Sequence, residues 1–407
     1  MKILIITPHF PTFDVYHSRA DDPRTKFLYD YALEWIKIGH DVNIIHCIPR
    51  YPSLFSIVVR IIEYFSKNRT GQLERFLQKK DTVQKADYTY KGLKIVRVPI
   101  SKYIPHRDFF SLSVRILKNR INKLLKQKNW NYDIIISDFL SPSLSIACDL
   151  SSFKVPIYQI FHQSDLLYLK NKNLFALLQQ IDCALFRSFS LKNEIIKSGY
   201  MPKDFHLMFS GIPVDLKLGK CRKSITKFIY VGNLRYSKNV QQLIKAFASA
   251  HLNTSCTLEI VGSGPNEREF RLLVDELEIS SKVKFMGKLS REQVFKRMAA
   301  SDCLVMVSKE TFGMVYVEAM SQGCIVVAAK AQGIDGVIVD GKNGFLEPLE
   351  DIDSLSKTLS KLSCLDEKSI KKISENALHT ASRMYDNILA EDLIKKIKIT
   401  KGVVSGG

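Results

Sequence analysis

The sequence predicts an α/β protein made of two doubly wound domains, and three observations support this. The chain has 407 residues, more than one hydrophobic core usually holds, so two domains of roughly 200 residues are expected. Short apolar strands alternate with amphipathic helical stretches, which is typical of parallel sheets covered by helices. Turn-forming residues between Gly199 and Asp215 interrupt this alternation, and the pattern then restarts.

The first half opens with an apolar strand at residues 3–6. Residues 25–38 follow, with apolar side chains at helical spacing, and Gly39 ends that helix. Further strands are expected at residues 42–47, 95–98, 134–137, 157–161 and 184–186. Strands that alternate with helices in this way favour a parallel sheet.

The second half repeats the pattern. Strands are expected at residues 227–231, 257–261, 283–285, 303–307 and 325–328, and helices at residues 240–250, 265–277 and 291–299. A final helical stretch covers residues 368–398, with a kink at Tyr385 and Asp386. We therefore expect an N-terminal domain at residues 1–205, a C-terminal domain at residues 206–385, and a last helix with a flexible tail at residues 386–407.

Composition is that of an ordinary globular protein, with 46% hydrophobic residues and a mean hydropathy of −0.04. No apolar run approaches the ~18 residues that span a bilayer. The apolar start is too short for a secretory leader, so a cytoplasmic location is expected. The eight cysteines form no Cys-x-x-Cys pair and lie mostly among apolar residues. We expect them to be core residues, with no metal site.

Positive charge is concentrated in one region of the chain. The net charge is +19, and residues 50–130 hold 19 Lys and Arg against 5 Asp and Glu. Within this region, residues 54–65 and 109–128 have the pattern of basic amphipathic helices. Each is either a core helix with a solvated basic face or a contact with an anionic membrane surface, which would make the protein peripheral to that membrane. No nucleic-acid-binding module is recognisable, so nucleic acid is not an expected partner.

The most informative segment follows the strand at residues 303–307. It places Glu310 before a short break at residues 311–313 and Glu318 inside the helix that follows. A helix N-terminus offers unpaired N–H groups and a positive dipole to a phosphate, and carboxylates accept hydrogen bonds from sugar hydroxyls. The alternative is that both glutamates are ordinary solvated helix residues.

An ordered series of motifs surrounds that segment. It includes Tyr230-Val-Gly-Asn-Leu-Arg-Tyr-Ser-Lys-Asn-Val, Leu258-Glu-Ile-Val-Gly-Ser-Gly-Pro and Asp340-Gly-Lys-Asn-Gly. The series, which runs through about residues 208–347, resembles the donor domain of retaining glycosyltransferases of family 4, the group 1 type. The resemblance implies the GT-B fold, in which two Rossmann-like domains face a central cleft, and a last helix that crosses back to the N-terminal domain. The first half of the chain is similar only in general pattern.

The resemblance assigns roles to matching positions. It implies that Glu310 holds the hydroxyls of the transferred sugar, that Glu318 binds the nucleotide ribose and that Lys238 binds the diphosphate. Lys238 would otherwise be an ordinary surface lysine. The implied diphosphate cradle is the backbone of Phe312, Gly313, Met314 and Val315, and the loop around Gly287 and Leu289 is implied to contact the base.

One position departs from the family pattern. The family commonly has a second phosphate-binding arginine directly after the strand glycine, where this chain has Asn233. Arg235 is the candidate replacement, two residues further on. A lysine at the leaving group supplies positive charge without a metal ion, so the resemblance implies a metal-independent enzyme with no cofactor.

Candidate residues in the first domain follow two expected strands. His162 and Asp165 come after the strand at residues 157–161. His162 resembles the family's histidine against the transferred sugar, and Asp165 is a candidate residue on the acceptor side. An isolated histidine is more often structural. The loop after the first strand carries prolines and aromatic residues in place of the family's glycines, and His9 in it is a candidate contact for the acceptor.

The resemblance, together with these residues, implies a retaining glycosyltransferase that moves a sugar from a UDP- or GDP-sugar to a glycan or lipid-linked acceptor in surface polysaccharide or glycolipid synthesis. Two alternatives remain open. A nucleotide-sugar epimerase has the same fold and needs no acceptor. A non-catalytic protein that binds anionic membranes would use the basic region alone.

Overall fold

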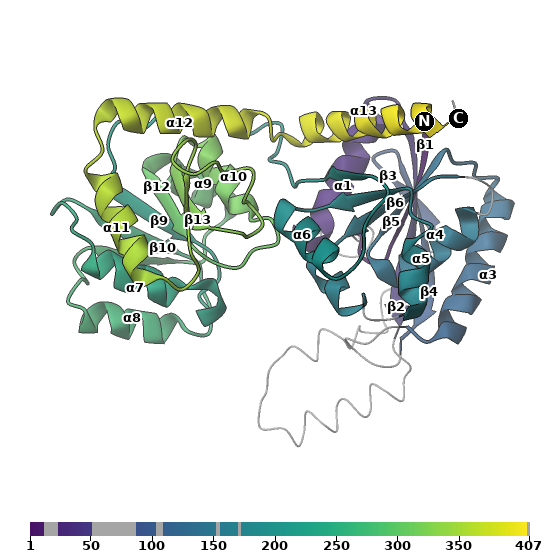
Figure 1. Cartoon of the computed structure of the whole chain (residues 1–407), viewed down its shortest axis with the longest axis horizontal. Helices are drawn as coiled ribbons and strands as arrows, with labels where there is room; N and C mark the ends of the chain where they lie inside the picture. Colours follow the sequence, from purple (N-terminus) through teal and green to yellow (C-terminus); the bar gives the residue numbers. More distant parts are fainter. Residues whose placement is uncertain (12–22, 51–86, 103–108, 152–154, 170–171, 405–407) are drawn as a thin grey trace, which may run out of the picture. The chain divides into compact units, whose positions relative to one another are not determined.

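The computed structural model describes residues 1–11, 23–50, 87–102, 109–151, 155–169 and 172–404. The chain divides into two compact units, each with a largely parallel sheet between helices (Figure 1). Unit 1 comprises residues Met1–Phe186, Glu194–Met208 and Ala390–Gly407, and unit 2 comprises Arg187–Asn193 and Phe209–Leu389. The helix expected at residues 54–65, and with it much of the basic region at residues 50–130, lies outside the described residues.

The sheet of unit 1 has the strand order β3-β4-β2-β1-β5-β6-β7-β8. Its strands are β1 (Lys2–Thr7), β2 (Asp41–Arg50), β3 (Asp87–Tyr90), β4 (Leu93–Ser101), β5 (Ile134–Asp138), β6 (Ile157–Phe161), β7 (Cys183–Phe186) and β8 (Phe205–Leu207). Among the strands that the structure describes, only β3 and β4 pair antiparallel. The central strands β5, β6 and β7 are buried along their whole length, as expected for parallel strands covered on both faces.

The helices of unit 1 are amphipathic, and they pack their apolar stripes onto this sheet. In the described ranges they are α1 (Pro23–Lys37), α3 (Ser111–Lys128), α4 (Ser145–Leu150), α5 (Lys172–Leu178) and most of α13 (Asp386–Val404). In α13, the main-chain oxygen of Ala390 accepts a 3.0 Å hydrogen bond from the Trp35 indole. The oxygen of Ile397 accepts one of 3.4 Å from the Tyr158 hydroxyl. The last helix thus becomes part of the first unit.

The sheet of unit 2 is wholly parallel, with the order β11-β10-β9-β12-β13-β14. Its strands are β9 (Lys227–Val231), β10 (Thr257–Val261), β11 (Val283–Gly287), β12 (Cys303–Met306), β13 (Ile325–Ala329) and β14 (Phe345–Glu347). Its helices are α7 (Val240–Ser249), α8 (Glu267–Glu276), α9 (Arg291–Ala300), α10 (Met314–Ser321), α11 (Ile352–Ser363) and α12 (Glu367–Ser382). The helix α6 (Phe189–Lys197) spans the division between the two units.

The predicted α/β architecture and every strand expected from apolar runs are confirmed. Three short strands, β3, β8 and β14, were not predicted, because three or four residues carry too little periodicity. The expected kink in the last helix is a full break: α12 ends at Ser382, and α13 begins at Asp386. Tyr385 in this break donates a 2.8 Å hydrogen bond to the oxygen of Leu216.

The strand order reverses once in each sheet, and ligands of such folds bind at that point, beyond the carboxyl ends of the strands. In unit 1 the reversal lies between β1 and β5, which end at Thr7 and Asp138. In unit 2 it lies between β9 and β12, whose following loops carry Lys238 and Glu310. Lys238 and Glu310 thus lie in the loops where this fold class binds ligands.

No helix within the described ranges is long and apolar enough to cross a membrane.

Candidate active site

Lys238 and Glu310 form an ion pair in unit 2. Lys238 ends a short helical turn after β9, and Glu310 lies in the loop after β12. The same carboxylate oxygen accepts a 3.2 Å hydrogen bond from the Ser308 hydroxyl. The side chains are 26% and 19% exposed, so both charges remain within reach of a ligand. Two residues that are 72 positions apart in the chain therefore form one small polar site.

The backbone between Glu310 and α10 is held in a tight turn. Gly313 precedes the helix with φ of +84° and ψ of +67°, and a Cβ there would lie 2.2 Å from the ring of Tyr316. A Cβ on Gly333 would lie 2.3 Å from the carbonyl of Thr311. A side-chain ring against Gly313 and a close backbone approach at Gly333 thus constrain the loop that carries the predicted diphosphate cradle. The first N–H groups of α10 have no partner within the helix.

Two buried tyrosines support this turn. Tyr316 donates a 2.8 Å hydrogen bond to the oxygen of Met306 at the end of β12. Tyr230 donates one of 3.1 Å to the oxygen of Asn233 after β9. Burial, and after it the negative charge of Glu310, raises the pKa of both hydroxyls well above the ordinary value. Both tyrosines therefore stay protonated at neutral pH and serve as fixed donors to the two strand ends.

Glu318 is held by a residue that the sequence did not single out. Its carboxylate accepts a 2.8 Å hydrogen bond from the guanidinium of Arg291, at the start of α9. The carboxylate is 15% exposed, so it remains accessible at one side. Arg291 was missed because nothing in a sequence links two charges 27 residues apart on different helices.

The remaining predicted donor residues lie on neighbouring loops. Asn233 and Arg235 are both exposed in the loop between β9 and α7. In the described part of the chain, the Arg235 guanidinium makes no hydrogen bond or ion pair. Gly287 ends β11 with φ of +67°, and a Cβ there would meet no atom within 4 Å; the half-buried Leu289 follows it. These loops follow β9 and β11 in the sheet that also positions Glu310.

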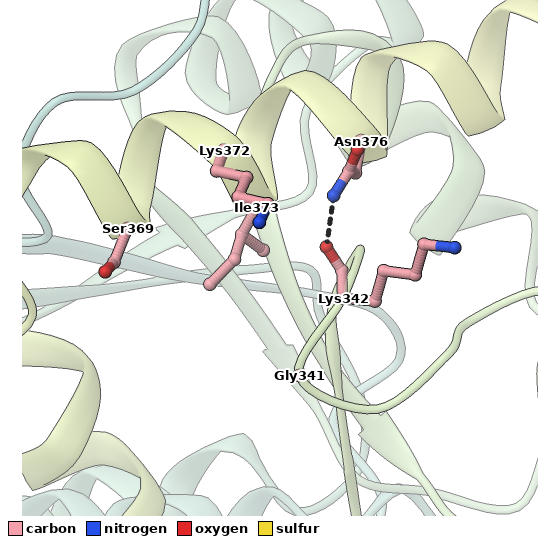
Figure 2. A pocket seen from close by; sticks show the side chains of 6 residues that line it. All are labelled: Gly341, Lys342, Ser369, Lys372, Ile373 and Asn376. Atoms are coloured by element: carbon pink, nitrogen blue, oxygen red, sulfur yellow. Dashed lines mark hydrogen bonds between the residues drawn. The ribbon is translucent and has the colours of Figure 1, made fainter.

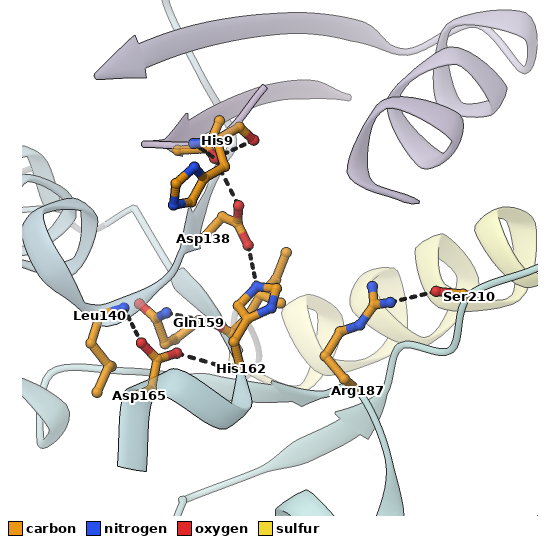
Figure 3. Close-up of polar contacts among 10 residues, drawn as sticks. His9, Asp138, Leu140, Gln159, His162, Asp165, Arg187 and Ser210 are labelled. Carbon is orange, nitrogen blue, oxygen red and sulfur yellow. Dashed lines mark hydrogen bonds and ion pairs between the residues drawn. The ribbon is translucent and has the colours of Figure 1, made fainter. Parts of the chain in front are cut away.

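In unit 1 the central polar residue is Asp138, at the end of β5 (Figure 3). Its carboxylate accepts a 2.7 Å hydrogen bond from the Thr7 hydroxyl, at the end of β1. The other oxygen lies 2.7 Å from Nε2 of His162, which directly follows β6. A proton on Nε2 is therefore fixed by the carboxylate, and this sets the orientation of the ring. Asp138 was not predicted, although an acidic residue that ends an apolar strand is a signal for it.

Asp165 lies behind His162 and is fully buried. Its carboxylate accepts hydrogen bonds from the backbone N–H groups of His162 at 2.8 Å and Leu140 at 3.1 Å (Figure 3). Burial raises the pKa of this carboxyl to about 6, although the charge of His162 and the two N–H donors oppose the rise. Asp165 therefore fixes the backbone around the histidine and does not reach solvent itself.

His9 and His162 both contact the ring of Phe139. The His162 ring stacks on it at 3.7 Å between ring centroids, and His9 meets it edge-on at 4.9 Å. Phe139 has φ of +61° and ψ of +150°, a conformation that costs an L-residue on the order of 1–3 kcal/mol and is concentrated at functional sites. This backbone strain places an aromatic ring between the two predicted histidines.

A separate hollow of about 260 Å³ lies between α12 and the loop at Gly341 and Lys342 (Figure 2). Asn376 reaches across from α12 and donates a 2.9 Å hydrogen bond to the oxygen of Lys342. The hollow is also lined by Ser369, Lys372 and Ile373. None of the predicted site residues lines it.

Solved structures place this architecture in a known class. The structure of Anabaena Alr3699/HepE in complex with UDP superposes with a TM-score of 0.66 at 17% identity and covers 98% of this chain and 100% of that one. The fold is thus that of the GT-B glycosyltransferases. Residues 221–380 match the model of the family described as "Glycosyl transferases group 1".

Sequence relatives agree with this assignment. The N-acetyl-alpha-D-glucosaminyl L-malate synthase of Bacillus anthracis is 27% identical over 230 residues, which are 54% of this chain and 59% of that protein. A Campylobacter jejuni protein is also 27% identical, over 236 residues, 56% of this chain and 63% of its own length. It is named N-acetylgalactosamine-N,N'-diacetylbacillosaminyl-diphospho-undecaprenol 4-alpha-N-acetylgalactosaminyltransferase. The chain thus spans about six tenths of the length of these two relatives.

Proposed function

We propose that the protein transfers a glycosyl unit from a nucleotide-diphosphate sugar to an acceptor hydroxyl. The observation that carries this proposal is the Lys238–Glu310 ion pair, next to the start of α10 at the point where the sheet order of unit 2 reverses. A diphosphate suits the ammonium group and the N–H groups of the helix end, whereas a carboxylate suits the hydroxyls of the sugar.

When the donor binds, Lys238 and Glu310 separate, and each takes a new partner. The diphosphate takes the ammonium of Lys238, and Glu310 then accepts hydrogen bonds from hydroxyls of the transferred sugar. Glu318, which Arg291 orients, accepts hydrogen bonds from the hydroxyls of the ribose. Arg235, exposed after β9, supplies a second cation for the phosphates. Charge that develops on the leaving diphosphate is thereby stabilised by groups already in position.

Unit 1 contributes the acceptor side and His162. The histidine, held by Asp138 at 2.7 Å, contacts the transferred sugar, and His9 contacts the acceptor. Reaction proceeds with retention: the bond from the anomeric carbon to the diphosphate breaks, the acceptor oxygen bonds on the same face, and the acceptor proton passes to the leaving phosphate. Neither a metal ion nor a cofactor takes part, since Lys238 and the helix end provide the positive field.

The acceptor is proposed to be lipid-linked, as the name of the Campylobacter jejuni relative states for that protein. The surface of α3 supports this proposal. Its buried stripe packs inward, while Phe110, Leu112 and Ile116 are exposed beside Arg115 and Arg120. Exposed apolar side chains among cations suit an anionic membrane surface, where such an acceptor resides.

A thermal-shift panel of UDP, GDP, ADP and their sugars tests the donor site. A ligand present at about 100 times its dissociation constant stabilises the folded protein by roughly 2.7 kcal/mol. We expect one nucleotide series to raise the melting temperature and Lys238→Met to abolish that rise. Lys245→Met, on the solvent side of α7, is the matched control and should keep it. If no nucleotide shifts the melting temperature, the donor-site proposal fails.

Activity is then measured with the responding sugar and a panel of lipid-linked acceptors. The anomeric configuration of the product is read by NMR, in the presence of EDTA. A retained configuration and unchanged rate with EDTA are expected. An epimerised nucleotide sugar formed without acceptor would establish the epimerase alternative instead.

A further inference from the structure

We propose that Cys183, Asp204 and His206 form a zinc-binding site in unit 1, separate from the residues of glycosyl transfer. The thiol sulfur, one carboxylate oxygen and one imidazole nitrogen of these residues all lie within 4.8 Å of one another. Within the described ranges, no other group of three His, Cys, Asp or Glu side chains comes this close.

The strand pairing of β7 with β8 creates this cluster. Cys183 is the first residue of β7, and Asp204 directly precedes β8. The N–H of Ala184 donates a 2.9 Å hydrogen bond to the oxygen of Asp204, and Leu185 is in register with His206. The hydrogen-bonded pairing of the parallel strands β7 and β8 therefore sets the positions of the three ligand residues.

The ligand set fits zinc in both chemistry and size. Zinc binds thiolate, imidazole and carboxylate in tetrahedral geometry, and its usual bond lengths place the ligand atoms about 3.4–3.6 Å apart. Nε2 of His206 lies 3.9 Å from the nearer oxygen of Asp204, so closure around an ion needs a movement of less than an ångström in this pair. Thiolate with imidazole favours zinc over magnesium or calcium, which prefer oxygen ligands.

The surrounding charges also favour a dication. Asp182 acts electrostatically on Cys183, and Asp392 and Lys396 of α13 act on His206. With Asp204 this makes three carboxylates against one ammonium group. The fourth coordination position is left to water, because the Asp392 carboxylate pairs with Lys396 at 2.6 Å.

The position in the sheet separates this site from catalysis. Cys183 and Asp204 lie at the amino ends of β7 and β8, whereas His162 follows the carboxyl end of β6. A metal ion here ties the edge strand β8 to β7 and closes a loop across residues 183–206. Because it binds the folded site and releases the thiol proton, it stabilises the folded protein without entering the transfer reaction.

The test uses the untagged, metal-stripped full chain with Zn²⁺ and Co²⁺. We expect calorimetry to show one strong Zn²⁺ site and a rise in melting temperature. Co²⁺ should give the intense near-ultraviolet absorption of a thiolate–cobalt bond. Cys183→Ala should abolish that absorption and, like His206→Ala, weaken Zn²⁺ binding by at least about 10–100-fold.

Matched variants keep the test decisive. Asp204→Asn alters a half-exposed side chain, so it should fold and still lose Zn²⁺ affinity. Cys148→Ala and His251→Ala, a buried cysteine and an exposed histidine elsewhere, should bind Zn²⁺ like the unaltered protein. The proposal is overturned if Co²⁺ gives no thiolate absorption, or if Cys183→Ala binds Zn²⁺ as tightly as the unaltered chain. Neither readout requires a nucleotide sugar, so the outcome is independent of the proposed function.

Discussion

At the residue scale, the contact between Lys238 and Glu310 in unit 2 determines what each side chain can bind. One oxygen of Glu310 accepts hydrogen bonds from both Lys238 and Ser308. A diphosphate bound as proposed would therefore compete with Glu310 for the lysine. The unliganded pair keeps both charges partly buried without leaving either uncompensated. Removing one partner should therefore affect nucleotide binding and turnover differently.

We predict opposite effects on nucleotide binding for two variants. Lys238→Met should weaken binding of the nucleoside diphosphate about 10–100-fold, since hydrogen bonds to charged groups contribute ~1.5–3 kcal/mol. Glu310→Gln should leave that affinity equal or higher, because the competing carboxylate charge is gone, yet lower turnover at least about 100-fold. Calorimetry and initial rates separate the two effects. If Glu310→Gln lost nucleotide affinity as Lys238→Met does, the proposal that Lys238 leaves Glu310 to bind the diphosphate would be wrong.

Asp165 predicts a pH dependence of stability with a defined sign. Its pKa in the folded protein, about 6, lies above the ordinary 3.8, so between these values the folded state binds more protons than the unfolded chain. Its contribution to stability is therefore full below about pH 4 and is lost as the pH rises through about 6. The loss is on the order of 3 kcal/mol.

Asp165→Asn should remove this slope. The stability of the unaltered protein relative to the variant should fall between about pH 4 and pH 7, as measured by denaturant unfolding at each pH. Asp353→Asn, on the exposed side of α11, is the control and should show a constant difference. A difference for Asp165→Asn that stayed constant or grew with pH would contradict the raised pKa.

At the scale of the elements, the start of α10 depends on one glycine. Gly313 has φ of +84° and lies against the Tyr316 ring, whereas Gly341 has φ of +69° with nothing within 4 Å of a Cβ. The two glycines thus share a left-handed backbone conformation and differ in their surroundings. Alanine variants of the two glycines therefore separate the cost of the left-handed backbone from the cost of the contact with Tyr316.

Gly313→Ala should destabilise the protein by the left-handed backbone cost of about 1–2 kcal/mol and by a further ~1–3 kcal/mol of overpacking. It should also weaken nucleotide binding, because the ring of Tyr316 must move at the helix start. Gly341→Ala should show only the first cost and normal nucleotide binding. Equal melting temperatures for the two variants would show that the contact with Tyr316 does not matter.

At the scale of the whole molecule, the net charge of +19 is the dominant physical property. Such a charge attracts anionic surfaces over about a Debye length, roughly 8 Å at physiological salt. In α3, exposed Leu112 and Ile116 add an apolar contact beside the cations. Both contributions should be visible in membrane binding.

We predict that the protein binds vesicles containing anionic phospholipid, and that added salt weakens this binding. Leu112→Asp, at a side chain of 65% exposure, should reduce co-sedimentation with vesicles several-fold. Leu272→Asp, at 58% exposure on α8 in unit 2, has the same charge change and should bind normally. Equal losses in the two variants would indicate a general charge effect and no surface specific to α3.

Much of the fold was predictable because its signals are local. Apolar runs located the long strands, and the break at residues 311–313 located the start of α10. The short edge strands were missed because β8 contains only Phe205–Leu207. Of the candidate site, the residue types on loops after strands were found, whereas Asp138 and Arg291 were not, since their significance comes from partners 24 and 27 residues away.

The sequence by itself determined two α/β halves, the loops that carry Lys238, Glu310 and His162, and the excess of positive charge. These follow from periodicity and residue order. Only the tertiary structure decided which side chains meet: Lys238 with Glu310, Asp138 with His162, and Cys183 with Asp204 and His206. The physical reason is that strand order in a sheet brings together residues from distant parts of the chain, and no spacing along the sequence encodes that order.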